Sequence, residues 1–287
     1  MPGEQPITGS LVFTRAVFSS AVSGSAVSGS AVFNNLAAGY ARSRPAVHPL
    51  VIERIYQHLR LGTDQLQPAR KIARALDVGC GSGLSTQPLD RLAVQTFGID
   101  VAEAMLAWAS RVAPHAHFAA GRAESLPIRG GSIGLITAAG SLNYASLDLF
   151  FPEAARVLAP GGALVVYDFS PGRAFADSGS LDEWFSDFMR RYPPPPGEAL
   201  ELSPHRLAQL TRLFHVQSHE DFAIPLTLSP AFYLDYVLTE TNVAYAVRNS
   251  IPREEIRGWC EDTLTPVFEG RNRAVLFRGY IAYLLAV

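Results

Sequence analysis

Three glycines and one aspartate in a short turn could hold a ligand against bare backbone. The stretch ALDVGCGSGLST, residues 75–86, places Asp77 ahead of Gly79, Gly81 and Gly83, with an apolar run before the turn and a candidate helix after it. Glycine-rich turns of this kind expose backbone N–H groups and allow close approach of a ligand at the carboxyl end of a strand. The turn is therefore the candidate binding cradle.

The glycine spacing separates two ligand classes that use such a turn. A dinucleotide fingerprint reads G-x-G-x-x-G, whereas the glycines here read G-x-G-x-G. Leu84 stands where the last glycine of a dinucleotide site would let helix and strand approach most closely. Leu84 and the acid ahead of the turn therefore disfavour NAD and an oxidoreductase.

The stretch LDVGCGSG resembles D-x-G-x-G-x-G, the first motif of the class I S-adenosylmethionine-dependent methyltransferases. The resemblance covers residues 72–170, where DVAEAML (100–106), GRAESLP (121–127) and ARVLAPGGALVVYDF (155–169) are similar to further motifs in the same order. It favours the type 11-like branch with the ubiquinone/menaquinone biosynthesis methyltransferases and trans-aconitate methyltransferase, because AAGYARSRPAVHP (37–49) resembles a Y-A-x-x-R-P segment of the latter. The resemblance implies an enzyme that methylates a small molecule with S-adenosyl-L-methionine.

The resemblance also implies which residues bind the cofactor. Asp100 would accept hydrogen bonds from both ribose hydroxyls. An NAD site would use the same acid, so Asp100 does not distinguish the two cofactors. Met105 would pack on the adenine, and Glu124 would read the adenine edge together with the Ala123 backbone. The remaining members of the expected set lie in the turn, after the fourth strand and in the segment before the domain: Asp77, Gly79, Gly81, Gly83, Gly140, Tyr40 and Arg44.

Two residues depart from the family's pattern. Arg122 replaces the usual Asp of the adenine loop, which leaves Glu124 as the acid for the adenine amino group, and Gly134 replaces a common Asp of the fourth strand. These departures keep open a second hypothesis, a non-catalytic relative that binds the cofactor or a metabolite as a sensor. Arg44, in turn, could equally be an ordinary surface arginine.

The ends of the fourth and fifth predicted strands supply the candidate catalytic residues. By the resemblance, Asn143 and Tyr144 fall beside the methyl group, and Asp168 is a candidate base. The alternative is that Asn143 caps the helix that begins near Ser146, that Tyr144 only packs, and that Asp168 caps a turn. Methyl transfer by in-line displacement needs alignment and a dry site, and it needs a base only where the acceptor carries a proton.

Short apolar runs alternate with helical stretches from residue 72 onward, which predicts βαβ units around a parallel sheet. The predicted fold class is α/β, a doubly wound, mostly parallel seven-stranded sheet of the Rossmann-like methyltransferase type with a helical aromatic cap. The predicted strands span 72–78, 94–100, 116–121, 133–140, 163–169, 215–224 and 274–287. The predicted helices span 85–93, 102–112, 147–158, 203–214, 229–249 and 252–268.

The composition predicts a tail followed by a single domain. Residues 1–32, in which SAVSG repeats, are expected to be a low-complexity, mostly disordered tail, and the lack of basic residues in their first ten positions disfavours a secretory leader. Residues 33–287 are expected to form one methyltransferase domain, with an N-terminal lid (33–70) and cap insertions at about 170–202 and 229–270.

Net charge, cysteine content and histidine spacing limit the partners, the compartment and the metal sites that we expect. The net charge is −2 and the arginines are scattered, so neither nucleic acid nor a membrane surface is expected as a partner. Cys80 and Cys260 make no disulfide framework, which favours a reducing, cytoplasmic compartment. His115 and His117 have no further ligand at a convincing spacing, so no metal site is predicted.

The predicted cap combines many aromatic residues with two unexpected polar ones. Aromatic side chains at helical spacing more often pack than bind, although a cap so rich in them also suggests an organic substrate with an apolar body. Glu240 and Asn242 interrupt an apolar helical stretch, and burial without partners would be costly for both.

Overall fold

The computed structural model describes residues 36–61, 71–196 and 199–287. The predicted tail, 1–32, and parts of the predicted lid, 33–35 and 62–70, lie outside the described residues.

The central sheet is parallel, as the strand–helix alternation predicts. Its order is β3-β2-β1-β4-β5, and each of these neighbouring pairs is parallel. The strands are β1 (Ile72–Val78), β2 (Ala93–Asp100), β3 (His117–Ala120), β4 (Ile133–Ala139) and β5 (Leu158–Phe169). Chain order reverses between β1 and β4, and ligands of open α/β sheets bind beyond the carboxyl ends of the strands at such a point.

Antiparallel strands extend the sheet beyond β5. β8 (Arg273–Ala286) pairs with β5, with β7 (Phe214–Leu228) and with β6 (Ala174–Phe175). The sheet therefore has eight strands instead of the predicted seven. The additional strand is β6, whose two residues are too few to show an alternating pattern in the sequence. The mostly parallel α/β architecture itself is confirmed.

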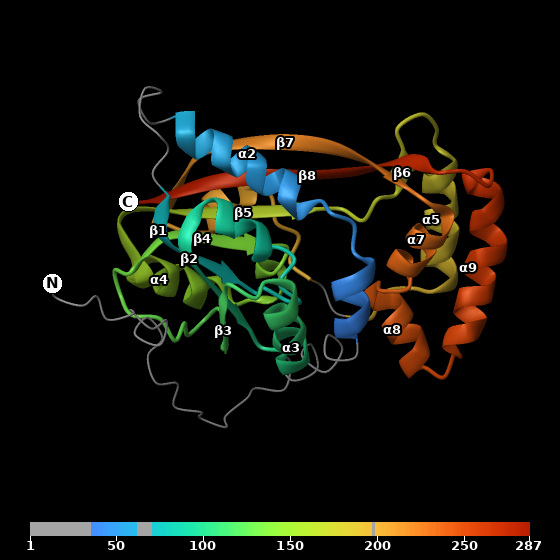
Figure 1. Cartoon of the computed structure of the whole chain (residues 1–287), viewed down its shortest axis with the longest axis horizontal. Coiled ribbons are helices and arrows are strands. Elements are labelled where there is room, and N and C mark those ends of the chain that lie inside the picture. Colours follow the sequence, from blue (N-terminus) through green and yellow to red (C-terminus); the bar gives the residue numbers. More distant parts are fainter. Residues whose placement is uncertain (1–35, 62–70, 197–198) are drawn as a thin grey trace, which may run out of the picture.

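Helices cover both faces of the sheet. On one face, α2 (His48–Leu61) buries Val51, Ile52 and Ile55 against β1, β4 and β5. On the other face, α4 (Leu147–Val157) buries its aromatic and aliphatic side chains in a second cluster, which α6 (Pro204–Leu210) completes. Figure 1 shows α2 and α4 on opposite sides of the strands. The helix α3 (Glu103–Val112) connects β2 to β3.

The predicted helix 85–93 is wrong in type. The structure forms a 3₁₀ helix, η2 (Gln87–Arg91), and β2 already begins at Ala93. The glycine-rich turn continues to Thr86, so the segment left before β2 is too short for a regular α-helix. The partial positive charge of a long helix is therefore not available at this turn.

The predicted helix 229–249 is two helices. The structure contains α7 (Pro230–Val237) and α8 (Thr241–Arg248), separated by residues 238–240. The break is stabilised by polar contacts: Thr239 Oγ1 donates to the Tyr236 carbonyl at 2.7 Å, and Arg253 donates to the Leu238 carbonyl at 3.1 Å. These contacts compete with helical hydrogen bonds, and a hydrophobic pattern does not reveal them.

The cap gathers at the far end of the β7–β8 pair (Figure 1). It consists of α7, α8, α5 (Ser180–Arg191) and α9 (Arg253–Phe268). The ring of Trp184 stacks on Phe188 at 5.3 Å and on Trp259 at 5.9 Å between centroids, and its Nε1 donates to Thr263 Oγ1 at 2.8 Å. These aromatic side chains therefore form the interior of the cap, which is the packing alternative that the sequence left open.

Replacement of Phe188 by alanine tests this aromatic core. Phe188 is fully buried, so Phe188→Ala is expected to lower the free energy of unfolding by about 3–5 kcal/mol, since the ring leaves a cavity among stacked neighbours. Chemical denaturation of the full chain measures the loss. Phe188→Leu, which refills most of the volume, should lose much less, and equal losses for both variants would contradict the packing argument.

Candidate functional site

The predicted site residues gather at the carboxyl edge of the parallel strands. The glycine-rich turn follows β1, Asp100 ends β2, residues 140–144 follow β4, and Asp168 lies near the end of β5. Because these four strands run parallel, their carboxyl ends share one edge of the sheet. We use the term carboxyl edge for this region.

Asp77 is a buried anchor beneath the turn. Its side chain is fully buried, and its Oδ2 accepts hydrogen bonds from Ser85 Oγ and Thr86 Oγ1, both at 2.7 Å. Thr137 Oγ1 of β4 donates to its Oδ1 at 3.1 Å. Burial raises the pKa of Asp77, and the three hydroxyl donors oppose that rise. The structure therefore assigns Asp77 to holding the turn on the sheet, and sequence reasoning missed the three hydroxyl residues.

The three glycines of the turn have different surroundings. All have positive φ, 70° at Gly79, 52° at Gly81 and 86° at Gly83. A Cβ at Gly79 would collide with Ser141, and a Cβ at Gly83 would lie 2.9 Å from the Ala109 Cα of α3. A Cβ at Gly81 would meet nothing within 4 Å. Gly79 and Gly83 thus permit close packing of the chain on itself, and Gly81 alone faces open space.

Asp100 lies directly beside Gly81. The Gly81 N–H donates to Asp100 Oδ2 and the Ala102 N–H donates to Oδ1, both at 2.8 Å. Burial raises the pKa of Asp100, and these backbone donors oppose the rise. A carboxylate offers about four lone-pair positions, so roughly two remain for a pair of ligand hydroxyls. The partly exposed carboxylate therefore fits the ribose-binding role predicted for it.

The residues expected to contact an adenine are already engaged. Met105 is buried against Ala37 and Ala102. Glu124 Oε1 accepts the Ser146 N–H at 2.9 Å, and Glu124 Oε2 lies 3.4 Å from Arg122 Nε. Ala123 is partly buried against the second core cluster. The structure thus brings these residues close to the edge, with Met105 buried and the Glu124 carboxylate already bonded.

Two of the candidate catalytic residues contact each other. Asn143 Nδ2 donates to Asp168 Oδ2 at 2.9 Å, and the Phe169 N–H donates to Asp168 Oδ1 at 2.8 Å. Burial raises the pKa of Asp168, and the Asn143 donor opposes the rise. A Cβ at Gly140, where φ is 59°, would lie 2.9 Å from Asp168 Oδ1. Asp168 therefore fixes the loop that follows β4.

The alternative in which Asn143 caps α4 is wrong. Ser146 occupies the N-cap position of α4, and its side chain makes no capping hydrogen bond. The Asn143 amide points instead to Asp168. Tyr144, in the 3₁₀ helix η3 (Leu142–Tyr144), is 64% exposed at the rim of the edge. Partial desolvation and the charge of Asp168 raise the pKa of Tyr144.

Residues 36–47, here called the covering segment, cross the carboxyl edge from α3 to the cap. Ala37 contacts Met105 of α3, while Gly39 packs closely on Thr239 in the cap. Figure 1 shows this segment, in dark blue, between α3 and α8. The covering segment therefore connects the sheet to the cap across the predicted site.

Arg44 is the polar centre of the covering segment. Its guanidinium lies 3.9 Å from the ring centroid of Tyr40 and 5.1 Å from that of Tyr236, and an Nη atom is 3.2 Å from Glu240 Oε1. Only 19% of its side chain is exposed, so Arg44 is not an ordinary surface arginine. Glu240, which the sequence marked as anomalous, is its ion-pair partner. Asn242 donates instead to the Tyr192 carbonyl at 2.9 Å.

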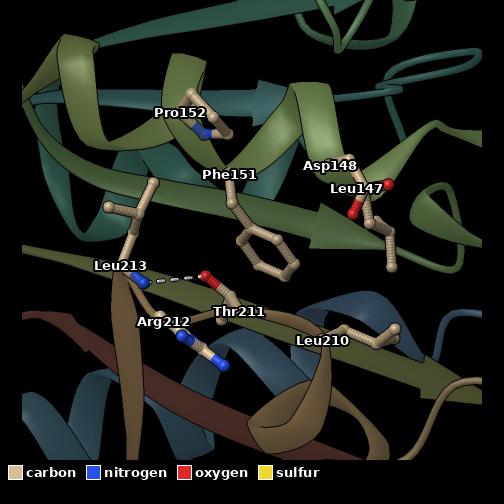
Figure 2. Close-up of a pocket in the computed structure, with 8 residues that line it drawn as sticks. All are labelled: Leu147, Asp148, Phe151, Pro152, Leu210, Thr211, Arg212 and Leu213. Atoms are coloured by element: carbon tan, nitrogen blue, oxygen red, sulfur yellow. Dashed lines mark hydrogen bonds between the residues drawn. The ribbon is translucent and has the colours of Figure 1, made fainter.

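A hollow outside the carboxyl edge is too small to be the main ligand site. It lies between α4 and the α6–β7 connection and has a volume of about 160 Å³, below the roughly 300–1,000 Å³ of common ligand pockets. Figure 2 shows Phe151 and Pro152 facing Thr211 and Leu213, and the Leu213 N–H donates to Thr211 Oγ1 at 3.1 Å. The carboxyl edge remains the candidate site.

The described part of the chain contains no cluster of three or more His, Cys, Asp or Glu side chains that could bind a metal. Cys80 and Cys260 are buried and free. None of the helices within the described ranges is both long enough and apolar enough to cross a membrane.

Comparison with known proteins shows which family the region of the parallel strands resembles. Residues 76–166 match the methyltransferase domain family. Over these residues the chain is similar to methyltransferase domains. A demethylmenaquinone methyltransferase of Beutenbergia cavernae is 36% identical over 103 residues, which are 36% of this chain and 43% of that protein. One from Tropheryma whipplei is 32% identical over 147 residues, 50% of this chain and 59% of its own length.

A solved structure supports the fold of the methyltransferase domain and its surroundings. A candidate type II methyltransferase from Anaeromyxobacter dehalogenans superposes with a TM-score of 0.61 at 22% identity, over 76% of this chain and 91% of that one. The prediction of a class I methyltransferase fold is thereby confirmed. The chain spans from a fifth to about three fifths of the length of the curated relatives it matches. The family match begins at residue 76 and ends at residue 166, so the covering segment, Asp168 and the cap lie outside it.

Alanine at two glycines of the turn tests their different surroundings. Gly83→Ala should lower the free energy of unfolding more than Gly81→Ala, since both place a side chain at positive φ, costing about 1–2 kcal/mol, and only Gly83→Ala also forces the turn against α3. Urea denaturation of the two variants measures the difference. Equal losses would mean that Gly83 does not pack on α3 as described.

Proposed function

We propose that this protein transfers a methyl group from S-adenosyl-L-methionine to an O, N or C atom of a small organic molecule. The observation that carries the proposal is the pairing of Gly81, which faces open space, with the partly exposed Asp100 carboxylate. Both stand at the carboxyl edge of a methyltransferase domain, where open α/β sheets bind their ligands. An NAD-dependent oxidoreductase is disfavoured because Leu84 replaces the last glycine of a dinucleotide site.

The described residues fit the ribose and the amino-acid end of this cofactor. At the ribose, Asp100 would accept two hydroxyls with the lone pairs that the backbone leaves free. At the amino-acid end, Arg44 would meet the carboxylate: its Nε is buried and has no hydrogen-bond partner in the described part of the chain. Tyr40, stacked under the guanidinium, would hold Arg44 in place. Glu240 limits the net positive charge there.

The adenine end requires the covering segment to shift or the base to enter beside it. Met105 would contact the adenine after Ala37 moves, while Glu124 and the Ala123 backbone would form the far wall. Arg122 already pairs with one oxygen of Glu124, the acid that would accept a hydrogen bond from the adenine amino group. This pairing favours, as the second candidate, a non-catalytic relative that binds the cofactor or a metabolite without turnover.

For methyl transfer, the protein mainly has to orient the cofactor and the acceptor and to exclude water. When bound, S-adenosyl-L-methionine supplies an activated methyl group, so no covalent intermediate with the protein is needed. The covering segment would shield the reacting atoms from solvent, and the Asn143–Asp168 pair would fix the loop that carries Tyr144 beside the acceptor. An acceptor that must lose a proton would need a base, and Asp168, whose pKa burial raises, is our candidate.

The small-molecule substrate and the cytoplasmic location remain predictions. The aromatic side chains of the cap pack mainly on one another, so the acceptor-facing surface would come from the Tyr40, Tyr144 and Tyr236 side chains around Arg44 instead. Two buried free thiols, Cys80 and Cys260, fit a reducing compartment.

Calorimetry on the full chain tests the ligand class. We expect binding of S-adenosylmethionine and S-adenosylhomocysteine and none of NAD. Asp100→Ala should weaken cofactor affinity by about 1–3 kcal/mol, because the ribose hydroxyls lose a charged acceptor. Asp148→Ala, which removes an exposed carboxylate of α4, is the matched control. Unchanged affinity in Asp100→Ala would refute the ribose assignment, and binding without turnover across many acceptors would favour the non-catalytic relative.

Arg44→Gln tests the amino-acid end of the cofactor. It should weaken S-adenosylmethionine binding by about 1.5–3 kcal/mol, as expected for the loss of a hydrogen bond to a charged group, and leave adenosine binding nearly unchanged. Arg42→Gln is the control, because Arg42 is exposed and lies over the Trp108 ring at 5.0 Å. Parallel losses for both ligands would instead place Arg44 in a purely structural role.

A further inference from the structure

His48 is a partly buried histidine with one ring nitrogen bound and the other unused. It begins α2, and its Nδ1 lies 2.9 Å from the hydroxyl oxygen of Tyr167. The ring stands edge-on to Phe169, with 5.2 Å between centroids, and to Tyr167 at 5.9 Å. Both aromatic residues lie at the carboxyl end of β5, so the imidazole sits over the carboxyl edge. The sequence analysis did not single it out.

The Tyr167 hydroxyl decides where the imidazole carries its proton. Tyr167 is fully buried. Within the described ranges, its hydroxyl has His48 as hydrogen-bond partner. Burial keeps the pKa of Tyr167 well above its usual value, so the hydroxyl stays protonated. A buried O–H without an acceptor would cost about 1–3 kcal/mol. The hydroxyl therefore donates to His48 Nδ1, and the ring proton resides on Nε2.

The imidazole is neutral at physiological pH. Burial lowers the pKa of His48 to about 4, and the nearby charge of Arg44 acts in the same direction. A neutral ring whose Nδ1 accepts a hydrogen bond is a donor at Nε2 and has no lone pair there to take a proton. His48 is thus suited to binding an acceptor atom and unsuited to acting as a base.

Nε2 is available to a ligand. It has no hydrogen-bond partner among the described residues, and the His48 side chain is only partly buried. The charge of Arg44 acts on the ring and lowers its pKa, and the ring of Phe169 stands beside it. A neutral N–H donor close to a cation and aromatic walls favours an oxygen atom with negative or partial negative charge.

We propose that His48 binds the methyl acceptor, donating a hydrogen bond from Nε2–H to a carboxylate or carbonyl oxygen, with Tyr167 as the positioning residue that fixes the tautomer. The proposal rests on the proposed methyl transfer and specifies the acceptor class of that same site. It makes the acceptor an oxygen-bearing molecule with an aromatic or apolar body, and it gives His48 a role in binding and none in proton transfer.

Nitrogen NMR of the full chain with ¹⁵N-labelled histidine tests the tautomer directly. The His48 resonances, assigned by their loss in His48→Gln, should show the Nε2–H tautomer from about pH 6 to about pH 8. Tyr167→Phe removes the donor to Nδ1, and the Nδ1–H form should then become populated. A charged ring in that pH range, or the Nδ1–H tautomer in the unaltered protein, would overturn the proposal.

Small aromatic probes test the acceptor class. Benzoate carries a carboxylate, acetophenone carries a carbonyl, and benzylamine carries neither. Benzoate, acetophenone or both should move the His48 Nε2–H resonance downfield, and benzylamine should not. The two oxygen probes separately report whether the site prefers the charged or the neutral oxygen. A resonance that responds to neither oxygen probe, or equally to benzylamine, would overturn the assignment.

Variants separate binding by His48 from structural effects. His48→Ala should weaken the better oxygen probe about fivefold, His48→Gln should recover most of that loss through its side-chain N–H, and both should leave S-adenosylmethionine affinity nearly unchanged. His58→Ala is the control on the same helix, because His58 stacks on Tyr283 at 3.7 Å instead of facing Tyr167. Equal losses in His48→Gln and His48→Ala would contradict the donor role.

The two proposals can fail separately. Absence of S-adenosylmethionine binding in calorimetry would remove the proposed function and leave the NMR result on His48 standing. Cofactor binding together with the wrong tautomer, or with no response to either oxygen probe, would remove the acceptor assignment alone.

Discussion

The buried Asp77 carboxylate is the constraint on which the carboxyl edge depends. A fully buried carboxylate is costly unless donors surround it, and here three hydroxyls from two parts of the chain meet that need. Their hydrogen bonds hold the glycine-rich turn on β1 and β4. The turn also directs the Gly81 N–H toward Asp100, to which it donates a hydrogen bond. One buried carboxyl group thus sets the position of the backbone and of the second carboxyl group that a ligand would meet.

A second layer of contacts joins the sheet to the cap. The covering segment packs on α3 at one end and on the α7–α8 corner at the other, and Arg44 lies between two tyrosine rings beside Glu240. The break between α7 and α8 creates that corner, since a continuous helix would not place Glu240 at an N-cap position. The cap therefore contributes to the edge through its corner, while its own aromatic residues stabilise its interior.

Local sequence patterns located most of the elements. The strands β1 to β4, α3 and α4 were predicted within a few residues because their apolar periodicity and their glycine and proline boundaries are local properties. The strand β5 begins at Leu158 instead of at residue 163, because it continues through the predicted turn at 159–162. The segments that were wrong have causes outside the local pattern. The helix expected at 85–93 is displaced by hydroxyls turned toward Asp77, the long helix at 229–249 breaks where Arg253 meets the Leu238 carbonyl, and β6 exists only through its pairing with β8.

The sequence by itself determined the fold class, the order of the motifs and the position of the binding turn, because a parallel sheet and a glycine-rich turn are written in the types and spacing of neighbouring residues. Only the tertiary structure decided which glycine faces open space, that Asn143 and Asp168 bind each other, that Arg44 pairs with Glu240 and that the Tyr167 hydroxyl lies within hydrogen-bond distance of His48. These contacts join residues far apart in the chain, and burial and hydrogen-bond partners at such separations arise only from packing.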